Sequence, residues 1–201
     1  MRHPEHRRKS EKNGSFKEVK EVILIVYEGK CTEYNYFWGI KKEYRYSHVL
    51  LNGPFPDPKT LVLETQKLLS RKKGINKVYC VFDHDGRKSF KSALDLIAEH
   101  NKNHSIKIEP ITSNPCFEIW ILLHYIFSTK GYSTQFTGKS TSSDLIKAVC
   151  KYFPNYTKNL QTIYQEVNAK NLSVFQKDDC TKNPYTDVHK LVLAIIPSAS
   201  I

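Results

Sequence analysis

Two short and largely apolar runs, the first of them rich in β-branched residues, constrain the fold of this chain more than any other feature. Residues 22–27 read VILIVY and residues 77–82 read KVYCVF. Neither run alternates between apolar and polar residues, which is typical of a strand buried on both faces, as in a parallel sheet. Both runs therefore predict central strands of an α/β fold.

Helical patterns separate these strands from two further ones. The expected strands are residues 22–27, 48–51, 77–82 and 105–111, and the expected helices are residues 32–44, 58–73, 89–101 and 114–127. Asp57 followed by Pro58 is a typical start for the second helix. This alternating order predicts a doubly wound, mainly parallel sheet of about four strands.

The remaining sequence divides into an N-terminal arm and a C-terminal addition. Residues 1–20 are rich in lysine and arginine and are expected to form a flexible basic arm, ahead of an α/β domain at 21–127. Residues 128–201 begin with a polar loop at 128–140 and continue with helical patterns at about 142–152, 157–169 and 184–196. We expect this part to pack on the same domain, although a small subdomain is an alternative.

The charge of the chain is strongly positive. Lysine and arginine number 31 against 20 acidic residues, a net charge of +11. Such a surplus favours a polyanionic partner, either nucleic acid, a nucleotide or an anionic membrane, and the alternative is a basic surface that only aids solubility. No apolar run approaches the roughly 18 residues of a membrane span, and no secretory signal is evident.

Cysteine usage favours a reducing compartment. The chain has five cysteines, and none form a CxxC pair. An odd number without metal-ligand spacing argues against a disulfide framework or a zinc ribbon. Cys80 and Cys116 lie in apolar surroundings and are expected to be small core residues. We expect a cytoplasmic protein.

Acidic residues follow both central strands. Glu28 directly follows the expected strand at 22–27. Asp83 directly follows the expected strand at 77–82, and Asp85 is two residues further along. If these strands are neighbours, as in a 2-1-3-4 order, the carboxylates converge at the carboxyl edge of the sheet, where such folds bind ligands. Carboxylates without thiolates favour Mg²⁺ or Mn²⁺, and Glu28 can complete the site or transfer a proton. Alternatively, the two aspartates cap the next helix and favour the turn.

Further candidates surround this edge. Glu118 lies in an otherwise apolar segment and needs a cation, a metal or a hydrogen-bond donor if it is buried. Lys30, Arg87 and Lys88 flank the acids and can hold phosphates, unless they belong to a solvated surface. Aromatic residues at 34–46, interleaved with lysines, can stack on unpaired bases, but Phe37, Ile40 and Tyr44 have the spacing of a buried stripe.

Four segments of this chain resemble a known family. A strand ending in Glu-Gly and a later strand ending in Asp-x-Asp resemble the TOPRIM fold of topoisomerases, primases and OLD-type nucleases. More narrowly, the chain resembles the RloB family in residues 28–37 (EGKCTEYNYF), 81–85 (VFDHD), 113–120 (SNPCFEIW) and 183–189 (NPYTDVH). Tyr27 departs from the small residue that is common before Glu-Gly.

The resemblance implies a metal-dependent, nuclease-like centre. It assigns Glu28, Asp83 and Asp85 as metal ligands, and Glu33 and Glu118 to a second metal position. Two metals would activate the attacking water and stabilise the leaving oxygen. The resemblance also implies a Mg²⁺-dependent endonuclease in prokaryotic antiviral defence, beside an AAA-type ATPase, with nucleic acid (RNA, including tRNA, or DNA) as substrate.

Two other functions remain open at this point. One is a non-catalytic module that binds nucleic acid or a nucleotide and works with an ATPase. The other is phosphotransfer on small nucleotides. The sequence also leaves open whether the chain forms a homo-oligomer.

Overall fold

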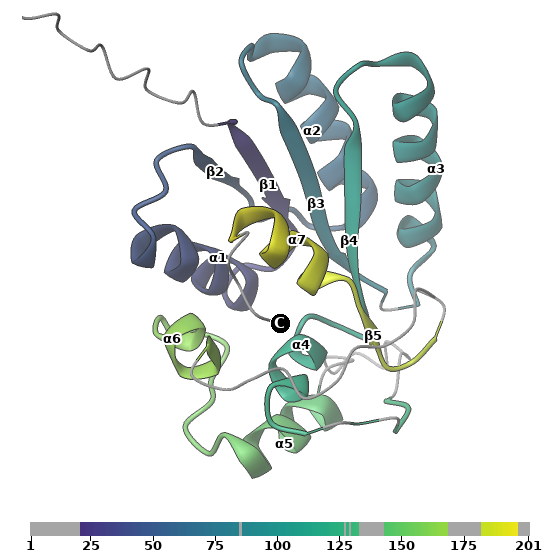
Figure 1. Cartoon of the computed structure of the whole chain (residues 1–201). Helices are drawn as coiled ribbons and strands as arrows, with labels where there is room; N and C mark the ends of the chain where they lie inside the picture. Colours follow the sequence, from purple (N-terminus) through teal and green to yellow (C-terminus); the bar gives the residue numbers. More distant parts are fainter. Residues whose placement is uncertain are drawn as a thin grey trace, which may run out of the picture.

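Five strands form one sheet in the order β2-β1-β3-β4-β5 (Figure 1). The computed structural model describes residues 21–84, 86–126, 128, 130–132, 143–168 and 182–196. The strands are β1 (Ile23–Tyr27), β2 (Val49–Asn52), β3 (Lys77–Asp83), β4 (Ile108–Asn114) and β5 (Tyr185–Thr186). All neighbouring pairs are parallel except β4 and β5, which are antiparallel.

The sheet confirms the predicted α/β class and the 2-1-3-4 order of its parallel strands. β1 lies between β2 and β3, with Tyr27 opposite Val81. β4 begins three residues later than predicted, because the side chain of Asn101 pairs with both the N–H and the carbonyl of Ile108, each at 2.8 Å. β5 is a fifth strand that the sequence did not predict, since two residues carry no alternating pattern.

Three predicted helices are confirmed within a few residues. They are α1 (Thr32–Glu43), α2 (Pro58–Arg71) and α3 (Lys88–Asn103). Asp57 caps α2 as predicted, accepting hydrogen bonds from the backbone N–H of Thr60 at 3.1 Å and from its hydroxyl at 2.7 Å. On α1, Phe37 and Ile40 are buried as predicted, but Tyr44 is not, because it lies just past the helix end and is 37% exposed.

The helix expected at 114–127 is much shorter. α4 runs only over Glu118–Leu123, because Asn114 pairs with Tyr185 and so extends β4. In the C-terminal part, α5 (Ser143–Tyr152) agrees with its prediction, whereas α6 (Ile163–Asn168) starts later than expected. α7 (Val188–Ile195) follows β5, which takes the first residues of the helix expected at 184–196.

The helices cover both faces of the sheet and enclose two apolar cores. Leu24 and Val26 of β1 face α2 and α3, whereas Ile23, Ile25 and Tyr27 face the core built with α1 and α4–α7 (Figure 1). α5 packs on α4, α6 on α1, and α7 on β4. Residues 1–20 and most of the predicted loop at 128–140 lie outside the described residues.

Two other predictions concern cysteines and membranes. Cys80 and Cys116 are buried as free thiols, as predicted, while Cys31 and Cys150 are partly exposed. Among the described helices, none combines the length and the apolar character required to cross a membrane.

Candidate functional site

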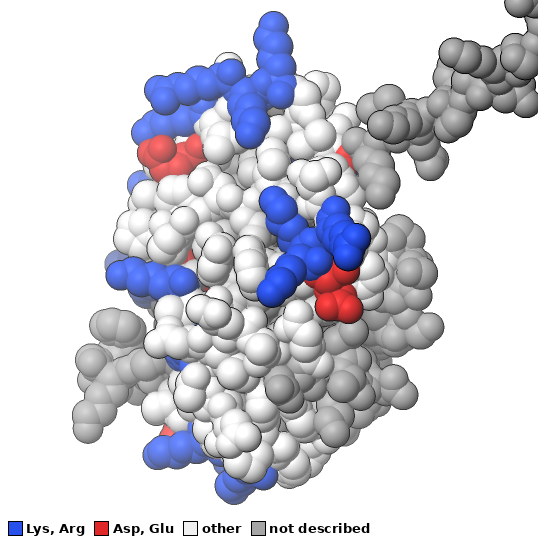
Figure 2. Space-filling model, turned by 90° about the vertical axis from the view of Figure 1, so that its left-hand side faces the viewer, with Lys and Arg blue, Asp and Glu red and all other residues white. Residues whose placement is uncertain are grey.

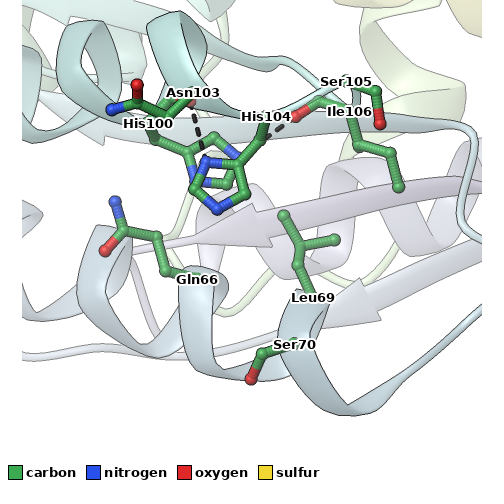
Figure 3. A pocket seen from close by; sticks show the side chains of 8 residues that line it. All are labelled: Gln66, Leu69, Ser70, His100, Asn103, His104, Ser105 and Ile106. Carbon is green, nitrogen blue, oxygen red and sulfur yellow. Dashed lines mark hydrogen bonds between the residues drawn. The ribbon is translucent and has the colours of Figure 1, made fainter.

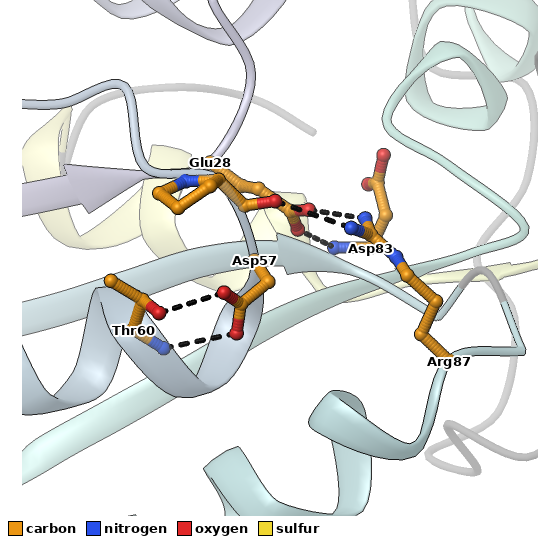
Figure 4. A network of polar contacts seen from close by, with 6 residues as sticks. Glu28, Asp57, Thr60, Asp83 and Arg87 are labelled. Carbon is orange, nitrogen blue, oxygen red and sulfur yellow. Dashed lines mark hydrogen bonds and ion pairs between the residues drawn. The ribbon is translucent and has the colours of Figure 1, made fainter.

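Glu28 connects the ends of β1 and β3 (Figure 4). Its backbone N–H donates to the carbonyl of Val81 at 3.1 Å, which continues the parallel pairing by one residue. Its Oε2 accepts a hydrogen bond from the backbone N–H of Asp83 at 3.3 Å. The two acids predicted from neighbouring strand ends therefore lie side by side at the carboxyl edge of the sheet.

Four carboxyl groups influence one another at this edge. Burial, followed by the negative charges of Glu33, Glu28 and Glu118, raises the pKa of Asp83 well above its usual range. Glu33 is only 5% exposed, and burial together with the charge of Glu118 raises its pKa to about 7. The fold thus disfavours the ionised forms of Asp83 and Glu33.

Gly29 permits this arrangement. A Cβ atom at Gly29 would lie 1.9 Å from Oε2 of Glu33, so a side chain at this position would displace the carboxylate. Glu33 is in the first turn of α1, which begins at Thr32. The Glu-Gly pair therefore lets the chain pass directly beneath the acid of the next helix.

Glu118 is compensated by groups of the chain, whereas Asp83 and Glu33 are not. It begins α4, is 2% exposed, and its Oε1 accepts from Thr32 Oγ1 at 3.3 Å and Tyr156 Oη at 3.1 Å. Lys158 Nζ lies 3.3 Å from the same oxygen. Burial alone would raise the pKa of Glu118, but the charge of Lys158 and a hydrogen bond from Cys116 outweigh it and lower the pKa. Glu118 is thus held ionised by donors of the chain itself.

The predicted phosphate-binding residues do not share one arrangement. Arg87 pairs with Glu28, with Nη2 at 2.5 Å from Oε1, and its Nη1 donates to the carbonyl of Pro56 at 3.2 Å. Arg87 is therefore an acid partner here, because the carboxylate of Glu28 lies within its reach. Lys30 and Lys88 are exposed, which agrees both with phosphate binding and with a solvated surface. Arg87 is also the N-cap position of α3, and its own side chain makes no capping hydrogen bond.

Asp85 lies outside the described residues, so its predicted place beside Asp83 is not described. Among the described residues, no three His, Cys, Asp or Glu side chains are arranged to hold a metal ion together. The donor set nevertheless fits a hard cation chemically, because Asp83 and Glu33 supply carboxyl oxygens whose ionisation is opposed by burial and then by neighbouring negative charge. A divalent cation would relieve that repulsion.

Sequence reasoning missed the three donors on Glu118. Thr32 begins α1, and Tyr156 and Lys158 lie in the connection before α6, where a helix start was expected. Their only signal was indirect, since a buried glutamate requires donors. Asp187, in the last of the four segments, was also not predicted as a buried acid; Tyr185 donates to it at 2.5 Å and Lys190 lies 2.8 Å away.

The molecule also has a cavity of about 480 Å³ away from the acids (Figure 3). It lies between the ends of α2 and α3, where the rings of His100 and His104 stack at 4.1 Å. The residues that line it precede β4, so it is at the amino-terminal edge of the parallel strands, opposite the acids. It does not belong to the candidate site.

The fold and the site define a mostly parallel α/β protein that gathers acidic side chains at the carboxyl edge of its sheet. The family described as RloB-like protein matches residues 23–195, so the chain belongs to the RloB-like family, as its four segments predicted. No curated protein and no solved structure matches the chain.

Proposed function

We propose that this chain is a metal-dependent phosphodiesterase that cuts nucleic acid at the carboxyl edge of its sheet. The observation that supports this most is the position of Asp83, beside Glu28 and within the field of Glu33 and Glu118. Such a concentration of carboxylates lowers the stability of a fold, and a bound divalent cation that also contacts phosphate would offset this loss.

Glu28, Asp83 and Asp85 would hold the cation, and Glu33 would join them. When bound, Mg²⁺ or Mn²⁺ would supply Lewis-acid stabilisation of charge on the phosphate and its leaving oxygen. The backbone N–H of Asp83 and the guanidinium of Arg87 hold the Glu28 carboxylate in its ionised form, which is the form that a cation binds. If Glu28 held a cation, the guanidinium of Arg87 would be available to pair with a phosphate in bidentate fashion.

The biological setting follows from family membership and from the resemblance described above. We propose a TOPRIM-like effector of prokaryotic antiviral defence that works with an AAA-type ATPase, with RNA, including tRNA, or DNA as its substrate. The positive charge of +11 supports a polyanionic substrate.

A second candidate is a module that binds nucleic acid without cutting it. The ion pair between Arg87 and Glu28, at 2.5 Å, favours this alternative because it neutralises one of the proposed ligands. A pure binding module predicts no cleavage with any divalent ion and an affinity that falls steeply with salt.

The deciding experiment compares the wild type with the double variant Asp83→Asn, Asp85→Asn. Because ionisation of Asp83 is disfavoured in the fold, its neutral amide should not impair folding. The matched control is Asp95→Asn, an exposed acid that pairs with Lys91 on α3, away from the edge. After expression of each variant, all RNA ends and DNA breaks in the cell are sequenced.

We expect new ends in one polymer with the wild type and the control, and none with the double variant. Purified protein should reproduce the cuts with Mg²⁺ or Mn²⁺ and lose them with EDTA. Cleavage by the folded double variant would refute the metal-nuclease function, and binding without cleavage by the wild type would establish the second candidate.

A further inference from the structure

Helix α1 exposes two of its aromatic side chains. Tyr34 and Trp38 are 38% and 36% exposed, whereas Tyr36 and Phe37 on the same helix are 2% and 0% exposed. Tyr34 and Trp38 are four residues apart, so they are neighbours on one face of the helix. The buried rings of Tyr36 and Phe37 pack α1 on the core, so the rings of Tyr34 and Trp38 are not needed for that packing.

A cation continues the same face. Lys42 is four residues after Trp38, and its Nζ lies 5.0 Å from the centre of the Trp38 ring. With a helical rise of about 1.5 Å per residue, Tyr34, Trp38 and Lys42 span about 12 Å along α1. Lys41 and Lys42 form the basic last turn of the helix, and lysine and arginine side chains gather in several groups on this side of the molecule (Figure 2).

This face begins at the acidic edge of the sheet. Tyr34 directly follows Glu33, and its ring is 5.9 Å from the ring of Tyr27, the residue before Glu28. A strand of nucleic acid that lies along α1 would therefore end next to the acidic edge. Continuity with the candidate site and the local positive charge indicate what this face binds.

We propose that Tyr34, Trp38 and Lys42 form a stacking platform that binds unpaired bases of a single-stranded segment and leads its backbone to the acidic edge. This inference rests on the proposed function, because it names the substrate class of the same site. Stacking needs the open face of a base, which a duplex does not present, and Lys42 can turn from the Trp38 ring to a phosphate. Aromatic side chains also occur in protein–protein interfaces, but the adjacent lysines and the continuity with the acidic edge favour a nucleic acid on this surface.

The two tryptophans of the chain make the platform measurable. Trp38 is 36% exposed and Trp120 is 1% exposed, so a base stacked on the platform should quench the emission of Trp38 alone. The full-length protein is titrated in EDTA, which prevents metal-dependent cutting, with short oligo(dT), oligo(U) and a duplex of equal length. We expect quenching by the single strands, little by the duplex, and no change in Trp38→Phe.

Affinity is measured in parallel by the anisotropy of labelled oligo(U) and oligo(dT). Trp38→Ala should weaken single-strand binding about tenfold, in keeping with the effect of removing one stacking side chain. The matched control is Tyr152→Ala, an aromatic residue that is 46% exposed on α5, and its affinity should equal that of the wild type.

Two results would overturn the platform. One is an unchanged affinity of Trp38→Ala for single strands, and the other is binding of the duplex as tight as that of the single strand. If Trp38→Ala still cuts and binds like the wild type while the double aspartate variant does not cut, the platform fails and the nuclease stands. If Trp38→Ala weakens single-strand binding but the wild type cuts nothing, the platform stands and the nuclease fails.

Discussion

Replacing Glu33 by glutamine should stabilise this protein. Glu33 is 5% exposed, and burial and the charge of Glu118 raise its pKa to about 7 from an ordinary value of 4.5. An acid whose pKa is raised in the folded state favours folding at low pH, and stability falls as the pH rises from about 4.5 to about 7. Glutamine keeps the shape of the neutral acid and removes the charge that the fold opposes.

The magnitude follows from the two pKa values. With a pKa of about 7 in place of 4.5, the ionised Glu33 costs the folded state about 3 kcal/mol above pH 7. At about pH 5.5 the native acid is mostly protonated, and the cost is only about 1 kcal/mol. Glu33→Gln should therefore gain about 2 kcal/mol more stability at about pH 8.5 than at about pH 5.5.

Urea unfolding at both pH values, in EDTA, measures this difference. Mg²⁺ provides the second arm, since a ligand that binds the folded state stabilises it. If Glu33 helps to hold the cation, Mg²⁺ should stabilise the wild type at about pH 8.5 and stabilise Glu33→Gln less. A variant that is equally or less stable than the wild type at the higher pH would refute the idea of opposed charge at this edge.

Three further substitutions test the local structure. Gly29→Ala would place a Cβ 1.9 Å from the end of the Glu33 side chain and displace its carboxylate, and urea unfolding should show a loss of no more than about 1 kcal/mol; a larger loss would show that the carboxylate cannot move aside. Lys158→Met should raise the pKa of Glu118, which NMR titration can measure. It should also destabilise the protein by about 1–2 kcal/mol, which is less than the loss for a fully buried pair because the lysine is nearly half exposed. Asp57→Ala should cost about 1 kcal/mol through loss of the α2 cap and leave the Mg²⁺ response unchanged; an altered response would show that the edge extends to this cap.

The sequence predicted the elements that rest on local patterns. The two apolar runs became β1 and β3, and Asp57 with Pro58 began α2. Its errors arose where a distant contact decides the structure. The β-pairing of Asn114 with Tyr185, 71 residues further along the chain, ends the expected helix before α4, and neither segment alone carries that information.

The same distinction between local patterns and distant contacts applies to the candidate site. Convergence of Glu28 and Asp83 was predictable, because parallel neighbouring strands bring their carboxyl ends together. The pairing of Arg87 with Glu28, and the donors that Tyr156 and Lys158 supply to Glu118, were not predictable, because each joins segments that only the folded chain brings into contact.

The acids at the edge differ in how their charge is balanced, and this difference locates the place for a cation. Glu118 has a lysine and two hydroxyl donors on one oxygen, and its pKa is lowered. Asp83 and Glu33 lie in the same field, yet the pKa of each is raised. Uncompensated carboxyls weaken the fold, and such destabilising groups are typical of sites that bind a ligand. A divalent cation would supply the missing positive charge, and the stability of Glu33→Gln with and without Mg²⁺ tests whether it does.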